Sequence, residues 1–152
     1  MKIQRAVPAQ AAQLTDIALA AKRYWRYPER WIEVWRPQLT ITPEYIAAHA
    51  VYTLCAADGE VLGFYALRAE AGTLQLDHLW LSPGSIGRGY GRRLFEHASE
   101  RARELGASAL EIEADPNARG FYERLGARLI GEHITAIEGQ PRHLPLLQFD
   151  LA

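Results

Sequence analysis

Residues 74–94, LQLDHLWLSPGSIGRGYGRRL, constrain this chain more than any other part of the sequence. They predict an apolar strand, a break at Ser82-Pro83-Gly84, a glycine-rich turn and the start of an amphipathic helix. The turn carries three glycines and three arginines, namely Gly87, Gly89, Gly91, Arg88, Arg92 and Arg93. The first turn of a helix has four unpaired N–H groups and a positive dipole end, and glycines admit close approach. The segment therefore predicts a phosphate-binding turn, and the plainer alternative is a glycine-rich loop before a helix.

The remaining hydrophobic pattern predicts a mixed α/β fold in which helices flank a sheet. Strands are expected at residues 2–7, 51–57, 61–69, 74–81, 109–113, 127–134 and 143–151. Helices are expected at residues 9–23, 31–35, 94–105 and 117–125, with a further helix start at 42–45. Pro37 is expected to end the second helix, and Asp58-Gly59 is expected to turn a hairpin.

Length and composition narrow the class of protein. A chain of 152 residues that is 49% hydrophobic and 23% charged is expected to form one ordinary globular domain. Its net charge of −1 argues against a general nucleic-acid binder. A single cysteine, Cys55, allows no intramolecular disulfide, and no apolar run has the length of a membrane span, so a cytoplasmic location is expected. The five histidines show no ligand spacing, so no metal is expected.

Two nucleotide-binding motifs come close to the glycine turn without matching it. A dinucleotide-binding turn requires G-x-G-x-x-G, whereas Arg92 stands where the third glycine belongs. Glu111 and Glu113 do lie about 20 residues further on, where that motif places an acid. However, the motif belongs in a largely parallel sheet, and here it follows three strands of an antiparallel meander. A P-loop is excluded because no Gly-Lys-Ser/Thr follows the turn.

Two blocks of sequence with this spacing resemble the GNAT superfamily of N-acetyltransferases. The family signature Q/R-x-x-G-x-G/A falls on residues 86–91, with Ile86 in place of the usual Gln or Arg. The second block, Asn-Ala-x-x-Phe-Tyr-x-x-x-Gly, falls on residues 117–126. The resemblance implies a mixed α/β GNAT fold with a mostly antiparallel sheet of six to seven strands, splayed between the fourth and fifth. It also implies one domain over residues 1–152, with a mainly helical acceptor-side region at 1–50 and the acetyl-CoA-binding core and C-terminal strands at 51–152.

The resemblance further implies acetyl-CoA as the acyl donor. The pyrophosphate is expected on the N–H groups of the turn, contributed by Gly87, Arg88, Gly89, Tyr90, Gly91 and Arg92. The pantetheine arm is expected to pair like an extra strand with the edge formed by Leu79, Trp80 and Leu81. The N–H of Leu79 is expected to stabilise the oxyanion that forms on the thioester carbonyl.

An amine that attacks a thioester directly needs an acid for the departing thiolate and an acceptor for its own proton. The resemblance assigns the acid to Tyr122, a phenol that is protonated at neutral pH, and a pantetheine contact to Asn117. Without the resemblance, Tyr122 is interpreted as a core tyrosine and Asn117 as a helix N-cap. Asp77 is the candidate base by analogy, and His78 points to the opposite face of the strand. Either residue is equally well interpreted as a strand residue bonded to a neighbouring loop.

Acceptor specificity in such enzymes usually lies in the N-terminal helices and in the loop between the last two strands, placed here at residues 140–143. Trp25, Tyr27 and His78 are the candidate substrate contacts, and the aromatic rings could line an apolar or cation–π pocket. Trp31 and Trp35, four residues apart, are more simply interpreted as packing a helix onto the sheet.

The sequence thus predicts an acetyl-CoA-dependent N-acetyltransferase that moves an acetyl group to a primary amine of a small molecule or peptide in a ternary complex. One alternative is a non-catalytic acyl-CoA-binding or sensing module on the same fold. Another is a nucleotide-binding domain of a different fold. The resemblance adds a homodimer as an expectation, and no nucleic-acid or membrane partner is expected.

Overall fold

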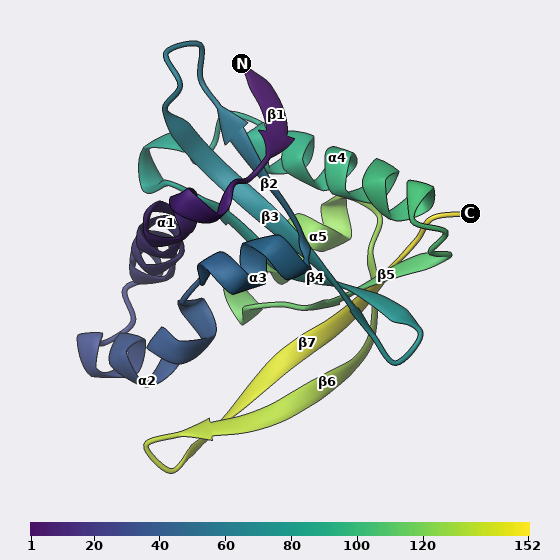
Figure 1. Cartoon of the computed structure of the whole chain (residues 1–152). Coiled ribbons are helices and arrows are strands. Elements are labelled where there is room, and N and C mark those ends of the chain that lie inside the picture. The colour runs from purple at the N-terminus through teal and green to yellow at the C-terminus, as the bar shows by residue number, and fades with distance from the viewer. The chain divides into compact units, whose positions relative to one another are not determined.

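The computed structural model describes the whole chain, from Met1 to Ala152 (Figure 1). Its strands are β1 (Lys2–Arg5), β2 (Ala50–Cys55), β3 (Val61–Glu70), β4 (Thr73–Leu81), β5 (Ala109–Glu113), β6 (Arg128–Ile137) and β7 (Gln140–Asp150). Its helices are α1 (Ala11–Tyr24), α2 (Glu29–Leu39), α3 (Pro43–Ala48), α4 (Tyr90–Glu104) and α5 (Arg119–Arg124). Short 3-10 turns are η1 (Pro8–Gln10), η2 (Pro83–Ser85) and η3 (Pro116–Ala118). The predicted mixed α/β fold is confirmed.

The strands form one sheet in the order β1-β2-β3-β4-β5-β7-β6. Antiparallel registers join β1 to β2, β2 to β3, β5 to β7 and β6 to β7, so the sheet is mostly antiparallel, as predicted. The parallel register of β4 and β5 pairs Leu74 with Leu110 and Gln75 with Glu111. This register lies near the start of both strands.

The chain divides into two compact units. The first contains Met1–Leu67 and His78–Ala98, and therefore the N-terminal helices, the end of β4 and the first half of α4. The second contains Arg68–Asp77 and Ser99–Ala152, and therefore β5, α5 and the hairpin of β6 and β7. The expectation of a single domain over residues 1–152 stays a prediction.

In the first unit, β3 is buried on both faces, and this places the helices around it. Phe64 and Ala66 belong to a hydrophobic core that includes residues of α1, α2 and α3. Tyr65 lies between them in sequence and points to the opposite face, because side chains alternate along a strand. Its hydroxyl lies 2.7 Å from Nδ1 of His97 on α4. The N-terminal helices and α4 therefore pack on opposite faces of β3.

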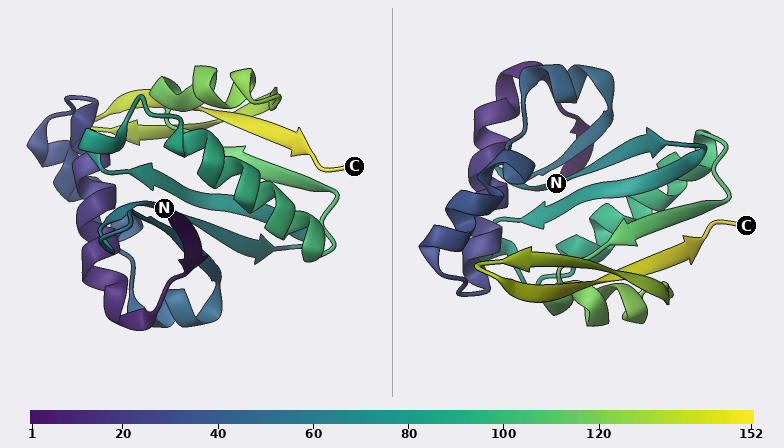
Figure 2. Two further views of the ribbon diagram at one scale, coloured as in Figure 1. Left: turned by 90° about the horizontal axis from the view of Figure 1, so that it is seen from above. Right: turned by 90° about the horizontal axis from the view of Figure 1, so that it is seen from below.

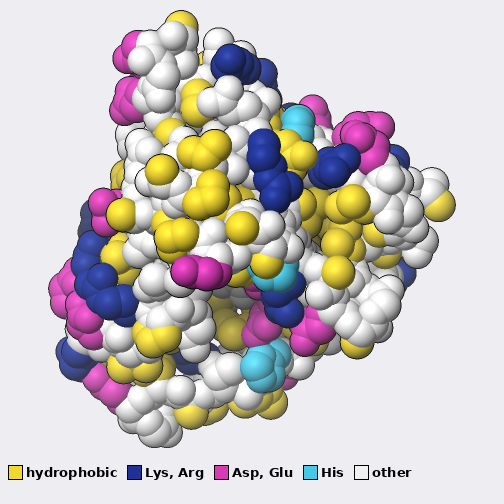
Figure 3. All heavy atoms as spheres, in the orientation of Figure 1, with side chains coloured by type: hydrophobic (Ala, Val, Ile, Leu, Met, Phe, Trp, Pro, Cys, Tyr) yellow, Lys and Arg dark blue, Asp and Glu magenta, His cyan; other side chains and the backbone are white.

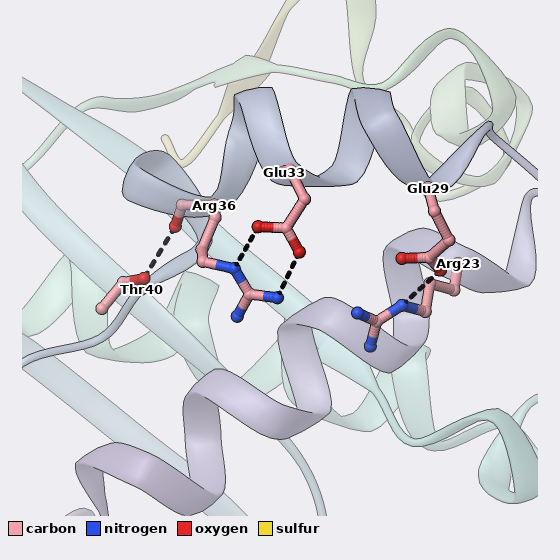
Figure 4. Close-up of polar contacts among 5 residues, drawn as sticks. All are labelled: Arg23, Glu29, Glu33, Arg36 and Thr40. Carbon is pink, nitrogen blue, oxygen red and sulfur yellow. Dashed lines mark hydrogen bonds and ion pairs between the residues drawn. The ribbon is translucent and has the colours of Figure 1, made fainter.

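Helix α2 continues past Pro37, so the prediction that this proline ends the helix is wrong. Pro37 lies in the last turn, and although it cannot donate a backbone hydrogen bond to the carbonyl oxygen of Glu33, two more helical residues follow it. The helix ends at Leu39, and Thr40 Oγ1 donates to the carbonyl oxygen of Arg36 at 2.7 Å (Figure 4). Figure 4 also shows two exposed ion pairs near this helix, Arg23 with Glu29 and Arg36 with Glu33.

In the second unit, β6 and β7 run side by side as a long hairpin, which both views of Figure 2 show. The turn consists of Glu138 and Gly139, whose φ angles are 51° and 75°. Two successive positive φ angles suit a tight two-residue hairpin turn. Residues 140–143, predicted as an acceptor loop, therefore belong to β7, and the correction follows from the shortness of this turn.

Basic and acidic side chains are interspersed on the face that Figure 3 shows. No helix has both the length and the apolar character needed to cross a membrane. No group of three or more His, Cys, Asp or Glu side chains is arranged to hold a metal ion.

Candidate active site

The segment between β4 and α4 is anchored to β3 before the glycine turn begins. Ser82 N donates to the carbonyl oxygen of Leu62 at 2.9 Å, and Ser82 Oγ donates to the same oxygen at 3.1 Å. The hydroxyls of Ser82 and Ser85 lie 2.9 Å apart, across the short turn η2. These bonds fix the point from which the glycine turn leaves the sheet.

The glycine turn has the backbone conformation that its sequence predicts. Gly87 and Gly89 have φ angles of 82° and 81°, in the left-handed region that side chains other than glycine rarely adopt. A Cβ built on either residue meets no atom within 4 Å, so the space above the backbone is open. Helix α4 begins at Tyr90, and Arg93 N donates to the carbonyl oxygen of Gly89 at 3.2 Å. The N–H groups just before Arg93 belong to the first helical turn, which has no intrahelical acceptors. Open glycine backbone next to a helix N-terminus fits a phosphate group.

Arg88 and Tyr90 of this turn also line an open cavity of about 610 Å³ in the first unit. The other lining residues are Met1, Ala56, Ala57, Glu60, Leu62, Ser82, Gly84 and Ser85. Arg88 thus gives the lining of this cavity a cationic residue that belongs to the glycine turn. The arrangement adds side-chain charge to the backbone site, as the sequence predicts for a bound anion.

His78 and Trp80 share one face of β4, as strand alternation predicts. Trp80 Nε1 donates to Nδ1 of His78 at 2.9 Å. The rings of Tyr45 and Phe64 lie beside the imidazole, with centroids 5.7 and 6.1 Å from it. Because Nδ1 accepts this hydrogen bond, the neutral imidazole carries its proton on Nε2. His78, a candidate substrate contact, is thus a buried member of an aromatic cluster.

Asp77, the candidate base, forms an ion pair within the second unit. Its Oδ2 lies 3.4 Å from Nε of Arg68, and Nη1 of Arg68 donates to Oε2 of Glu70 at 2.7 Å. Burial opposes the charged guanidinium, but the hydrogen bond to Glu70 and the charge of Asp77 outweigh burial and raise the pKa of Arg68. Asp77 therefore has a defined electrostatic partner, which sequence reasoning did not identify.

Tyr122, the candidate acid, lies in α5 and is buried. Its ring packs edge-on against Phe121, with centroids 5.0 Å apart. Burial disfavours the phenolate and raises the pKa of Tyr122 well above its usual range. The phenol therefore stays protonated at neutral pH, which is the state that a proton donor requires.

Asn117 is held at the turn that leads into α5. Oδ1 of Asp115 accepts hydrogen bonds from the backbone N and from Nδ2 of Asn117, both at 2.9 Å. Asp115 is thereby the N-cap of η3. Its second oxygen, Oδ2, lies 3.8 Å from Nη2 of Arg142 on β7. The side chains of Asp115 and Arg142 are only 6% and 13% exposed.

Three aromatic side chains, two from α2 and one from the loop between α1 and α2, pack against each other. The ring of Trp35 lies 4.9 Å from that of Tyr27 and 5.9 Å from that of Trp31. The buried ammonium of Lys22 lies over two of these rings, 4.4 Å from Trp35 and 5.2 Å from Tyr27. Tyr27 and Trp35 also pack against the hydrophobic core. The candidate contact Tyr27 is thus engaged by a cation of the chain itself, whereas Trp25 is partly exposed.

Three cations were not predicted as partners of candidate site residues, namely Lys22, Arg68 and Arg142. Lys22 follows Leu14 and Ala18 at a spacing of four residues, so its place on the buried face of α1 was readable from the sequence. Arg68 and Arg142 contact residues on other elements, and no local motif marks them. The assignments of Asp77, Leu79, Asn117 and Tyr122 to catalysis and cofactor binding stay predictions.

Comparison with known proteins places these features in a family. Residues 12–127 match the Acetyltransferase (GNAT) family. Among curated proteins, Blasticidin-S acetyltransferase of Streptomyces morookaense is 37% identical over 86 residues, which make up 55% of this chain. The match spans 62% of that relative, and therefore less than two thirds of its length.

Solved structures share the fold across nearly the whole chain. The GCN5-related N-acetyltransferase of Rhodopseudomonas palustris has a TM-score of 0.81 at 21% identity, covering 98% of this chain and 94% of that one. PaiA N-acetyltransferase of Thermoplasma acidophilum, solved in complex with coenzyme A, has a TM-score of 0.76 at 17% identity and covers 98% of both chains. At these identities, the likeness shows the fold alone. The match of residues 12–127 to the family shows more, because it takes in most of the chain and both sequence blocks: this chain belongs to the GNAT family of acetyltransferases.

Proposed function

We propose that this chain is an acetyl-CoA-dependent N-acetyltransferase that moves an acetyl group to a primary amine in a ternary complex. The observation that carries the proposal is the turn at Gly87 and Gly89, where open left-handed glycine backbone leads into the N-terminus of α4. Membership of the GNAT family supports acetyl-CoA as the donor for this phosphate-binding backbone.

The donor supplies an acetyl group activated as a thioester, and the chain binds and orients it. The N–H groups of residues 87–92 hold the pyrophosphate, and Arg88 adds a charge-assisted contact. The edge of residues 79–81 holds the pantetheine arm, and the N–H of Leu79 donates to the thioester carbonyl oxygen. Asn117 bonds the same arm.

Two side chains move protons in the proposed reaction. The amine must lose a proton to attack, and Asp77 accepts it, directly or through water. The departing sulfur takes a proton from the phenol of Tyr122, which burial keeps protonated. The ion pair between Asp77 and Arg68 offers a competing, purely structural role for the carboxylate, so a variant of each residue is needed to separate the two.

The acceptor is proposed to be a small-molecule amine, with a peptide amine as the second class. The name of the relative Blasticidin-S acetyltransferase supports the small-molecule class for this chain. Trp25, Tyr27 and His78 are proposed to contact the acceptor, and Trp25 is the most exposed of them. A cytoplasmic location and a homodimer complete the proposal.

Calorimetric titration with acetyl-CoA, repeated with NAD and with ATP, tests the donor. We expect micromolar binding of acetyl-CoA alone, followed by release of free thiol with members of an amine panel that includes blasticidin S and short peptides. Absence of acetyl-CoA binding contradicts the proposed function. Binding without thiol release from any amine favours a non-catalytic acyl-CoA-binding module.

A further inference from the structure

Gly63 on β3 allows the backbone of β4 to approach very closely within the first unit. A Cβ built on Gly63 would lie 2.6 Å from the carbonyl oxygen of Trp80 and 2.7 Å from Cδ2 of Leu81, closer than real Cβ atoms come to other atoms. Cδ1 of Leu94 on α4 follows at 3.2 Å. The φ angle of Gly63 is not in the left-handed region, so glycine is required here for its lack of a side chain.

The contact with Gly63 shows how the peptide between Trp80 and Leu81 is turned. The carbonyl oxygen of Trp80 lies against Gly63, so it points toward β3. No peptide bond of the chain is cis, and the carbonyl and N–H of a trans peptide point in opposite directions. The N–H of Leu81 therefore points away from β3, which is the side of β4 where the proposed function places the pantetheine arm.

The residues on both sides of this peptide are anchored. The side chain of Trp80 packs against the hydrophobic core that includes residues of the N-terminal helices. Directly after Leu81, the backbone N–H and the hydroxyl of Ser82 both donate to the carbonyl oxygen of Leu62 on β3. Between these two anchors, a side chain at Gly63 would have to turn the peptide or push the edge of β4 away from β3, because dense packing transmits the strain.

We propose that Gly63 is a positioning residue for the pantetheine arm of the donor: by leaving space for the carbonyl of Trp80, it directs the N–H of Leu81 toward a carbonyl oxygen of the arm. The inference rests on the proposed function for its ligand. It adds to the donor site a residue of β3 that acts only through the backbone of β4. It also specifies which backbone donor of residues 79–81 depends on that residue.

A purely structural role for Gly63 makes a different prediction from a positioning role. An alanine that only disturbs the packing of β3 lowers stability, and it weakens every ligand equally or none. An alanine that displaces the peptide after Trp80 weakens only ligands that have the arm, because Ser82 still anchors the start of the glycine turn. Adenosine 3′-phosphate 5′-diphosphate has the nucleotide and pyrophosphate of coenzyme A but no arm, and is therefore the matched control ligand.

The experiment is a calorimetric titration of the full chain with coenzyme A and with adenosine 3′-phosphate 5′-diphosphate. For Gly63→Ala, we expect the Kd of coenzyme A to rise about tenfold, the loss of one good hydrogen bond, while the Kd of the truncated nucleotide stays within about twofold. Gly131→Ala is the matched control, because Gly131 also lies within a strand and a Cβ there would have an ordinary contact, 3.9 Å from Cδ1 of Leu146. It should leave both affinities unchanged. Equal losses for both ligands, or no loss for coenzyme A, in Gly63→Ala overturn the inference.

A second pair of variants separates the backbone contact from side-chain packing. Leu81→Ala removes Cδ2, so Gly63→Ala in that background still meets the carbonyl of Trp80 but no longer meets the side chain of Leu81. If the carbonyl contact positions the edge, Gly63→Ala raises the Kd of coenzyme A by the same factor in the Leu81→Ala background as in the wild type. A double variant that binds coenzyme A as tightly as Leu81→Ala assigns the loss to side-chain packing and overturns the inference.

Should Gly63→Ala fail to unfold cooperatively, the double variant replaces it, with Leu81→Ala as its reference, because the smaller side chain relieves part of the overpacking. The same selective loss of coenzyme A affinity is expected. A wild-type chain that binds neither ligand refutes the proposed function itself. A wild-type chain that binds both, without a selective loss in the variants, refutes only the inference.

Discussion

Two short segments of this molecule carry most of the candidate site, and they are built in opposite ways. The turn at residues 82–92 offers backbone N–H groups, and its shape depends on glycines whose φ angles are positive. The segment of residues 115–126, which contains η3 and α5, offers the side chains of Asn117 and Tyr122. At its start, the buried carboxylate of Asp115 bonds Asn117 and has an ionic partner on β7. A backbone site is determined locally, whereas a side-chain site also depends on residues far away in the sequence.

The difference has consequences for substitution. In the glycine turn, Gly87 and Gly89 cannot be exchanged, because any Cβ strains the left-handed conformation. In the segment of residues 115–126, a conservative exchange that keeps the backbone intact still removes the functional group. Substitutions in the glycine turn should therefore weaken coenzyme A binding first, whereas substitution of Tyr122 in α5 should lower turnover first.

The largest effect is expected from Gly89→Glu, which should weaken coenzyme A binding by about 1,000-fold or more, about 4 kcal/mol. The variant strains a residue whose φ is 81° and places a carboxylate at the anion site. Calorimetric titration measures the loss. Gly72→Glu is the matched control, because Gly72 has a φ of 82°, lies in a turn and has equally open surroundings. If both variants bind coenzyme A equally well, the glycine turn is not the phosphate site.

The next effect concerns Tyr122→Phe, which keeps the ring and removes only the hydroxyl. We expect kcat to fall about 100-fold, within the usual range for loss of a general acid, while the Kd of coenzyme A stays within about twofold. Steady-state kinetics and calorimetry on the same preparation measure the two values. Tyr24→Phe, at an exposed tyrosine of α1, should change neither. Unchanged turnover in Tyr122→Phe removes this residue from the mechanism.

A smaller effect is expected for Asp77→Asn, because water can replace part of the role of a base. We expect kcat/KM to fall about tenfold, about 1.4 kcal/mol. The companion variant Arg68→Gln breaks the same ion pair and leaves the carboxylate in place. It should lower kcat/KM by less than Asp77→Asn. Equal losses in the two variants would assign Asp77 to the ion pair rather than to proton transfer.

The comparison also explains which parts of the molecule were predictable from sequence. The helix start at Thr42 was predicted from local spacing, and Thr42 Oγ1 indeed accepts from Tyr45 N at 3.0 Å. The conformation of Gly87 and Gly89 was predictable for the same reason, since a glycine requirement is local. Pro37 was misassigned because a proline removes one backbone hydrogen bond without always ending the helix, and here two more helical residues follow it.

Partners on other strands could not be predicted in the same way. Arg142 lies 27 positions after Asp115, and only the register of β7 brings it to that carboxylate. The tight turn at Glu138 and Gly139 moved residues 140–143 from a predicted loop into a strand, since no Asn-Gly or Asp-Gly pair marks it. Contacts of this kind depend on strand register, which periodicity alone does not specify.

The smallest expected effect is on stability at high pH, and it tests the burial of Tyr122 in α5 without any ligand. Burial raises the pKa of Tyr122 in the folded chain above its unfolded value of about 10. Below that pH both states keep the proton, and stability is unaffected. As pH rises past it, only the unfolded state releases the proton, so stability falls. At pH 10.5 the loss should be about 0.8 kcal/mol, or about 2 °C in Tm.

Tyr122→Phe cannot titrate, so its Tm should fall less than that of the wild type between pH 8 and pH 10.5, by about this 2 °C. The other groups that titrate in this range are shared by both chains and cancel in the difference. Thermal unfolding followed by circular dichroism at the two pH values measures it. An identical fall in both chains would mean that folding does not raise the pKa of Tyr122, and it would contradict the burial of this hydroxyl.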